Sequence, residues 1–219
     1  MLVDRIKLNN GVIQKLEETA QAIYKQWFVE FEFPEPLTST EEKYIGYKSK
    51  GWEMEESEMG IIPKGWKVGT LDEIIDIIDG DRGTNYPSQE EFTSSGYCLF
   101  LNASNVSKKG FNFSTSNFIS KDKDKALRKG KLSRYDIVLT TRGTVGNIGY
   151  YGESIPFENI RINSGMVIMR SKISVEESIF VYSLLQWFVI KKILLSDNFA
   201  PISKFSNDIF IFLCVRVYA

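Results

Sequence analysis

The feature that most constrains this chain is a heptad pattern across residues 2–31. Apolar side chains recur at alternating spacings of four and three through four successive heptads, with Asn9 as a polar member. The seam consists of Leu2, Ile6, Asn9, Ile13, Leu16, Ala20, Ile23 and Trp27. This pattern predicts one helix of about 45 Å, at about 1.5 Å per residue. A single helix cannot bury its own seam, so we expect a partner helix from another segment or another chain, with an ordinary core helix as the alternative.

After this helix the sequence predicts a polar linker and then a globular domain. Pro34 and Pro36 end it, because proline lacks the amide donor and clashes with the preceding turn. The acidic stretch that follows has no sustained periodicity, which indicates a linker or surface loop. We therefore expect an α+β chain: a long coiled-coil-type helix, then a globular mixed α/β domain. The predicted division is helix 1–33, linker 34–60, domain 61–205 and an atypical, apolar tail 206–219.

Within the predicted domain, hydrophobic runs and turn residues indicate short elements. Strands are expected at 66–68, 97–101 and 137–141, extended structure at 111–118, and a strand pair at 160–168 that bends at Gly165. Helices are expected after Thr70, within 121–134, and at 175–195, where a wide apolar face favours core packing.

Composition limits the possible chemistry. The chain contains no histidine, which removes the most common general base, the most common zinc ligand and any Ser-His-Asp triad. Cys98 and Cys214 lie far apart without CxxC spacing, which favours buried thiols of a cytoplasmic protein. Charge interrupts every long apolar run, so we expect neither a membrane span nor a signal peptide.

Motifs that bind nucleotides or metals were not found. The sequence lacks GxxxxGK[ST] and a strand–GxGxxG–helix unit, which argues against an ATP motor and against a dinucleotide or S-adenosylmethionine domain. The set Glu35…Glu41-x-Lys43 resembles a nuclease arrangement, but its polar linker has no strand to hold it, so coincidence is favoured. We expect no catalytic residue, no metal site and no cofactor on this chain.

Two adjacent segments are candidates for contact with nucleic acid. The net charge is −1, yet residues 121–134 carry seven Lys or Arg against two Asp. Local charge matters more than the total because screening confines each patch to roughly 10 Å. The following segment, 134–151, reads as a strand and then places Gly143, Gly146 and Gly149 at every third position. Taken alone, that segment suits a tight hairpin as well as a site where the backbone approaches a phosphate or a base edge.

Four stretches, taken together, resemble the specificity (S) subunit of Type I restriction-modification enzymes. LEETAQAIYKQWFVEFEFP (16–34) is similar to the conserved helical region of that family, and IPKGWKVGTLDEI (62–74) to the entry of a target recognition domain. GYCLFLNASNV (96–106) and RYDIVLTTRGTVGNIG (134–149) are similar to its internal strands. The resemblance covers residues 1 to about 205.

The resemblance implies a non-catalytic recognition subunit. In the family, two target recognition domains each read half of a bipartite double-stranded DNA site, and conserved helices separate them and dock two modification (methyltransferase) subunits. S-adenosylmethionine, ATP and magnesium are then expected on the modification and restriction/translocase subunits. This chain shows one such domain and one helix, so it resembles a half-subunit or a truncated subunit, and a homodimer through the helix is a further expectation. FAPISKFSNDI (199–209) resembles the junction to a second helix, but FIFLCVRVYA does not continue as that helix.

The predicted contacts follow from side-chain chemistry, since cations position a protein on phosphates and paired donors and acceptors read bases. Phosphate contacts are expected from Lys121, Lys123, Lys125, Arg128, Lys129, Lys131 and Arg134. Base contacts are expected from Arg82, Asn85, Tyr86, Asn102, Asn105, Arg142, Thr144 and Asn147. The helix interface is expected at Leu2, Ile6, Ile13, Leu16, Ala20, Ile23 and Trp27.

Two alternatives to DNA recognition stay open from sequence. The chain could be a protein-interaction module that acts through its helix, with the domain as a scaffold. A nuclease is the third reading.

Overall fold

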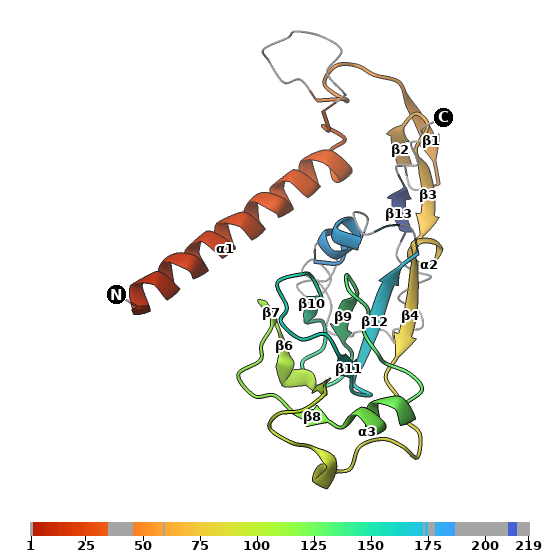
Figure 1. Cartoon of the computed structure of the whole chain (residues 1–219). Coiled ribbons are helices and arrows are strands. Elements are labelled where there is room, and N and C mark those ends of the chain that lie inside the picture. The colour runs from red at the N-terminus through yellow and green to blue at the C-terminus, as the bar shows by residue number, and fades with distance from the viewer. Residues whose placement is uncertain are drawn as a thin grey trace. The chain divides into compact units, whose positions relative to one another are not determined.

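The structure is a computed structural model that describes residues 2–34, 46–58, 60–172, 174, 178–186 and 210–213. The chain divides into two compact units. Unit 1 comprises Met1–Thr70 and Ile209–Ala219, and unit 2 comprises Leu71–Asp208. The predicted α+β character, with a long helix followed by a mixed α/β domain, is confirmed (Figure 1). The division lies at Thr70, whereas the sequence placed the start of the domain at Ile61.

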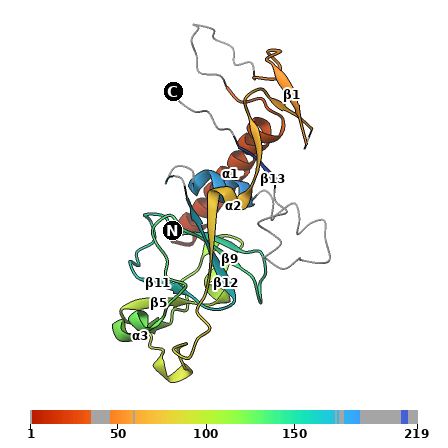
Figure 2. The same ribbon diagram turned by 90° about the vertical axis from the view of Figure 1, so that its right-hand side faces the viewer.

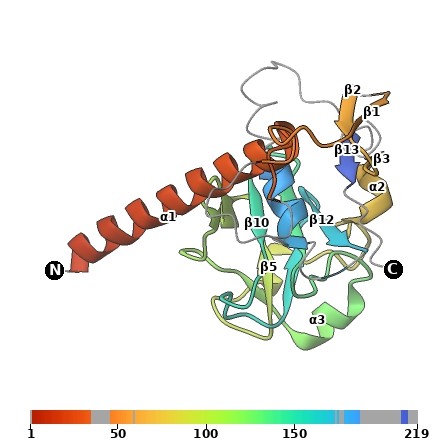
Figure 3. The same cartoon turned by 90° about the horizontal axis from the view of Figure 1, so that it is seen from above.

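In unit 1 the predicted long helix is present. Helix α1, Leu2–Tyr24, is a straight rod (Figure 3) that continues as a π-helical turn, Lys25–Val29. The Glu30 N–H donates to the Lys25 carbonyl at 3.0 Å, and Phe31 then takes a positive φ of 60°, which ends the helix before Pro34. The helix is therefore ended by Phe31, whose backbone is in the left-handed region, and Pro34 follows three residues later.

Aromatic residues hold the C-terminal end of this helix on the rest of unit 1. Phe31, Ile62 and Trp66 are buried together, with Phe28 and Phe33 packed against them. The Trp66 ring stacks on Phe33 at 5.1 Å between centroids and meets Phe31 edge-on at 5.6 Å. The wide apolar face at this end of the helix thus contacts strands of its own unit.

The linker prediction for 34–60 is wrong at its C-terminal end. Strands β1, Met54–Ser57, and β2, Gly60–Pro63, form an antiparallel hairpin. β3, Lys67–Thr70, pairs with β13, Phe210–Leu213, so part of the tail that matched no continuation is a strand. The β3–β13 ladder joins distant segments, so local sequence carries no sign of it, whereas β1 and β2 are neighbours in sequence.

Unit 2 begins with a helix much shorter than predicted. α2 spans Leu71–Ile74, and the next five residues form strand β4, Ile75–Asp79. β-branched isoleucines suit a strand, and β12 supplies the ladder partner. β4 is one edge of a four-stranded antiparallel sheet of order β10-β9-β12-β4, in which β4, β9 and β12 run side by side (Figure 2). The other members are β9, Ile137–Thr140, β10, Ile148–Tyr150, and β12, Met166–Ser171.

A second sheet has the order β11-β5-β8. It contains β5, Cys98–Leu101, β8, Phe118–Ile119, and β11, Ile160–Ile162. The predicted strand pair at 160–168 is wrong as a pair: β11 runs parallel to β5, whereas β12 joins the first sheet. Helix α3 spans Lys121–Ala126, and β6, Val106–Ser107, pairs with β7, Gly110–Phe111. Residues 178–186 are helical, and the rest of the predicted helix 175–195 lies outside the described residues.

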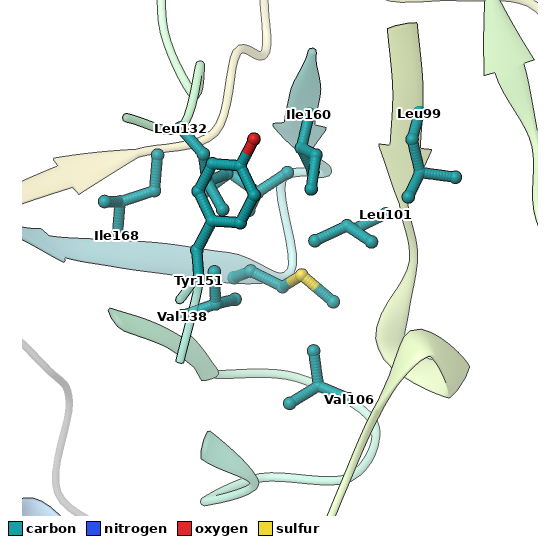
Figure 4. Packing of buried hydrophobic residues seen from close by; sticks show 10 residues of the cluster. Leu99, Leu101, Val106, Leu132, Val138, Tyr151, Ile160 and Ile168 are labelled. Atoms are coloured by element: carbon teal, nitrogen blue, oxygen red, sulfur yellow. The ribbon is translucent and has the colours of Figure 1, made fainter. Parts of the chain in front are cut away.

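The core of unit 2 lies between the two sheets. Side chains from β5, β9, β11 and β12 converge there, together with Tyr151, as Figure 4 shows. The cluster contains Leu99, Leu101, Val106, Leu132, Val138, Tyr151, Ile160, Ile162, Met166 and Ile168. Cys98 is fully buried beside it, and burial raises the pKa of its thiol to about 12, which keeps it protonated and inert.

A buried ion pair joins α3 to the second sheet. The Arg161 Nε atom donates to Asp124 Oδ1 at 2.6 Å, and Lys131 Nζ donates to Asp124 Oδ2 at 2.5 Å. Burial alone would raise the pKa of the Asp124 carboxyl, but the two cationic donors outweigh it and the pKa is lowered. Asp124 is therefore charged in the folded chain and is neutralised by two partners.

Replacing Arg161 tests this pair. We expect Arg161→Met to lower the free energy of unfolding by about 3–5 kcal/mol, because it leaves a buried carboxylate without one of its two cationic partners. Urea denaturation at neutral pH measures the change. Lys172→Met is the matched control, since Lys172 lies 3.5 Å from the exposed Asp76 and such pairs contribute about 0–1 kcal/mol. Equal losses in the two variants would contradict a special role for Arg161.

Candidate nucleic-acid interface

The segment after α3, residues 127–130, is fixed by side chains on both edges of its backbone. From one side, Arg161 donates to the Leu127 carbonyl at 3.0 Å and to the Lys129 carbonyl at 2.7 Å. From the other side, Asp81 Oδ2 accepts from the N–H groups of Arg128 at 2.7 Å and Lys129 at 3.3 Å. The backbone is thus held in place while the side chains of Arg128 and Lys129 remain exposed.

Asp81 also fixes the loop from which it comes, residues 80–86. Its Oδ1 atom accepts from the Gly83 N–H at 2.7 Å. That donor lowers the pKa of the Asp81 carboxyl, burial opposes it, and the N–H groups of Arg128 and Lys129 lower it further. Asn85 adds a second link, because its Nδ2 atom donates to the Ala126 carbonyl at 3.1 Å. The loop after β4 and the segment after α3 therefore run side by side (Figure 1).

Between this loop and this segment lies a cavity of about 480 Å³. Three cationic residues contribute to its lining, Arg82, Arg128 and Lys129. The other lining residues are Asp79, Gly80, Asp81 and Gly83. The Arg82 side chain is about half exposed, and its Nη2 atom lies 3.9 Å from Asp79 and 3.4 Å from the Ser164 carbonyl.

The turn at residues 163–165 connects Arg82 to the glycine-spaced segment. The N–H groups of Thr141 and Arg142 both donate to the Gly165 carbonyl, at 2.8 and 3.1 Å. Strands β9 and β10 pair in antiparallel fashion, so the glycine-spaced segment forms a hairpin, and its tip also carries exposed side chains. Arg142 and Thr144 are exposed at its tip. Loop 80–86, turn 163–165 and hairpin tip 141–147 thus lie in one hydrogen-bonded series.

The predicted base contacts divide into two groups. Arg82, Asn85, Arg142 and Thr144 are exposed and could meet a ligand, although Asn85 Nδ2 also donates to the Ala126 carbonyl and Thr144 Oγ1 to the Ala103 carbonyl at 3.4 Å. The others are engaged in the fold: Tyr86 packs edge-on against Phe100 at 5.6 Å, and Asn147 Nδ2 donates to the Val106 carbonyl at 2.8 Å. Asn102 Oδ1 accepts from the Ser104 N–H at 2.9 Å and begins a 3₁₀ turn.

For Asn105 the predicted base contact does not fit the structure. The residue is fully buried, and its Oδ1 atom accepts from the Asn102 N–H at 2.9 Å. Its Nδ2 atom donates to the carbonyls of Asn112 and Thr115, at 3.0 and 2.7 Å. The side chain organises the loop between β5 and β8 and presents no free edge to a base.

The predicted phosphate contacts divide in the same way. Lys121, Lys125, Arg128 and Lys129 are exposed, with Lys121 Nζ 5.4 Å from the Tyr97 ring centroid. Lys123 forms an ion pair with Glu91 at 2.6 Å, and Lys131 is bound to Asp124. Arg134 donates to the carbonyls of Gly152 and Ile155, at 3.0 and 2.9 Å, and lies over the Tyr151 ring. These last three cations stabilise the fold in this conformation.

The predicted helix interface stays a prediction. Ile6, Ile13, Leu16 and Ile23 are between 41% and 64% exposed, and Leu8 and Val12, outside the predicted seam, are exposed as well. Ala20 is also exposed, Trp27 is half-buried against Phe28, and the Leu2 side chain lies outside the described residues. The exposed apolar surface on α1 is therefore wider than a two-position seam.

Sequence reasoning missed the two residues that organise this region, Asp81 and Arg161. Arg161 had a detectable signal, since it interrupts an apolar strand between two isoleucines and a cation there needs buried partners. Asp81 had none, because an aspartate between glycines in a polar loop is ordinarily a turn residue.

Comparison with known proteins identifies the family. Residues 63–205 match the family described as the type I restriction modification DNA specificity domain, which is more than half of the 219 residues. The chain belongs to this family.

Relatives of this specificity domain include larger proteins. The specificity subunit of the type I restriction enzyme MjaIX from Methanocaldococcus jannaschii is 27% identical over 198 residues, covering 89% of this chain and 40% of that protein. The solved HsdS subunit from Thermoanaerobacter tengcongensis shares the fold with a TM-score of 0.54 and 17% identity, over 97% of this chain and 43% of that one. The S subunit from M. genitalium gives a TM-score of 0.50 and 18% identity, over 96% and 46%. The chain spans less than half the length of each.

The described residues of this specificity-domain protein were also compared with two general features, a membrane span and a metal site. No helix there is long and apolar enough to cross a membrane. No three His, Cys, Asp or Glu side chains gather there in a way that could hold a metal ion.

The carboxylate of Asp81 gives a pH-dependent prediction. Because its pKa is lowered on folding, the charge stabilises the fold above the ordinary aspartate pKa of about 3.9, and that stabilisation is lost as the pH falls through the lowered value. We expect Asp81→Asn to lower the free energy of unfolding by about 1.5–3 kcal/mol at pH 7, with a difference from wild type that narrows below about pH 4.

Denaturant titrations at several pH values measure this difference. Asp79→Asn is the control, since this neighbouring carboxylate is exposed and lies 3.9 Å from Arg82, where a pair contributes about 0–1 kcal/mol. A loss in Asp81→Asn that is constant from pH 7 to pH 3 would show that the charge is not what stabilises the two loops.

Proposed function

We propose that this chain recognises double-stranded DNA in a sequence-specific manner as a specificity subunit, or half-subunit, of a type I restriction-modification complex. The observation that carries the proposal is the hydrogen-bonded series of loops in unit 2, which presents Arg82, Arg128, Lys129 and Arg142 from a fixed backbone. Cations of this kind neutralise phosphates, and exposed Arg and Asn side chains near them can read base edges. Membership of the specificity-domain family supports the same reading.

In this proposal the chain itself catalyses nothing. Modification subunits would supply S-adenosylmethionine and adenine methylation, and the restriction/translocase subunit would supply ATP-driven movement and cleavage with magnesium. The exposed apolar side chains of α1, among them Ile6, Ile13 and Leu16, would dock those subunits or a second copy of the chain. Co-expression with the cognate modification subunit, followed by mapping of methylated sites, tests docking and target together.

DNA binding by the chain alone is the first test. We expect a mixed-sequence duplex to be shifted in a native gel at low salt, because the dissociation constant there should be well below the about 10⁻⁴–10⁻⁶ M that non-specific electrostatic binding gives at physiological salt. Binding should weaken steeply as salt rises. Absence of any shift at tens of micromolar protein would favour the alternative function, a protein-interaction module acting through α1.

Arg142 is the residue we expect to read sequence. Arg142→Ala should weaken binding to the cognate half-site by about 1–3 kcal/mol, and weaken binding to random DNA less, because a bidentate contact to guanine is lost. Its N–H stays bonded to Gly165 in the variant, so the hairpin is retained. Competition binding on both duplexes measures the difference, and equal weakening would reassign Arg142 to a phosphate.

A further inference from the structure

The cavity between loop 80–86 and segment 127–130 has the features of a site built for an anionic group. Its cationic lining comes from two separate stretches of chain, Arg82 from the loop, and Arg128 and Lys129 from the segment. Of the two carboxylates in the lining, that of Asp81 is occupied by three backbone N–H groups. Asp79 lies 3.9 Å from Arg82 and about half of it is exposed. The side chains thus leave an excess of positive charge at the cavity.

The glycines around the cavity keep its walls close. A Cβ atom on Gly80 would lie 2.2 Å from the Asn163 carbonyl oxygen, and one on Gly130 would lie 3.1 Å from the Gly80 Cα atom. Gly130 also has a positive φ of 81°, which favours glycine. A Cβ on Gly83 would lie 2.9 Å from Arg128 Nη2, so the Arg128 guanidinium rests against the loop. The Arg128 guanidinium is therefore placed against the loop before any ligand arrives.

The composition of the lining selects among the groups that DNA offers. Among the described residues the lining contains neither an aromatic ring on which a base could stack nor a side-chain amide that could pair with adenine. Arg and Lys carry donors and no acceptors, which suits phosphate oxygens. Phosphates also stand on the outside of a duplex, whereas a base must leave its stack to enter a concave site.

We propose that this cavity holds a single backbone phosphate of bound duplex DNA, shared by Arg82, Arg128 and Lys129, with Asp81 as the residue that positions all three. The proposal rests on the function proposed above and deepens it. It assigns Arg82 to phosphate contact, in place of the base contact expected from sequence. Arg142, on the other side of turn 163–165, remains the residue proposed to contact a base.

The salt dependence of DNA affinity counts the phosphates that are neutralised, with a slope of about 0.9 per phosphate in a plot of log K against log salt concentration. The test compares the full-length chain with the triple variant Arg82→Ala, Arg128→Ala, Lys129→Ala. The probes are a mixed-sequence duplex and a duplex enriched from a random library by the wild-type chain. We expect the slope to fall by about 0.9 on both probes, with the same fold loss of affinity on each.

Several results would overturn the proposal. A fall in slope near three times that value would mean three separate phosphates, and an unchanged slope would place the cavity outside the footprint. A larger fold loss on the enriched duplex would mean base contact. If the wild-type chain binds neither probe, the proposed function itself is wrong, and this outcome is distinct from the others.

Two further variants separate charge from position. The control Arg5→Ala, Lys7→Ala, Lys15→Ala removes the same charge from exposed positions of α1 in unit 1, and should leave the slope close to wild type. Asp81→Asn retains all three cations, so we expect weaker binding on both probes at an unchanged slope, with circular dichroism used to check folding. Wild-type affinity in Asp81→Asn would overturn the positioning role of Asp81.

Discussion

Arg161 lies in the apolar strand β11 and gives its guanidinium hydrogens to Asp124 and to carbonyls on either side of the end of α3. Because the group is buried, each of these donors must find an acceptor, and the acceptors lie in one short stretch of chain. The part of that stretch after α3, residues 127–130, is also held by Asp81, which accepts from the N–H groups of Arg128 and Lys129. Two buried charges of opposite sign thereby specify the path of a backbone that belongs to neither sheet.

The same principle extends to the neighbouring loops of unit 2. Arg142 is placed by its own N–H on the Gly165 carbonyl, and Asn105 holds the loop before β8 through two carbonyls. Burial of side chains fixes the arrangement of the sheets, and hydrogen bonds to the main chain fix the conformation of the loops. The loops are therefore ordered without covering the side chains that face outward. An interface ordered in advance loses less conformational entropy on binding.

Sequence predicted what depends on periodic burial. The heptad helix, strand β5 and the hairpin of β9 and β10 follow from local patterns, and the family could be named from four stretches. Pairing between strands far apart in sequence could not be predicted. Strand β4 was predicted as helix because its partner β12 lies about ninety residues away. The DNA contacts expected from sequence stay predictions, and the structure sorts them by exposure. The exposed cations were identified, but Lys131, Arg134 and Asn105 turned out to serve the fold, since composition does not show which polar groups are buried.

One consequence concerns how such a domain can change its target. Asp81 and Arg161 hold the backbone atoms of residues 83 and 127–129, so the fold depends little on which side chains positions 128 and 129 carry, whereas Leu127 is buried in the core and Gly83 lies against Arg128. The exposed residues at 82, 128 and 142 can be exchanged at a low cost in folding free energy, because surface substitutions away from special backbone positions usually change stability by about 0.5 kcal/mol or less. Under the proposed function, a change in the recognised DNA sequence is thereby uncoupled from a change in the scaffold.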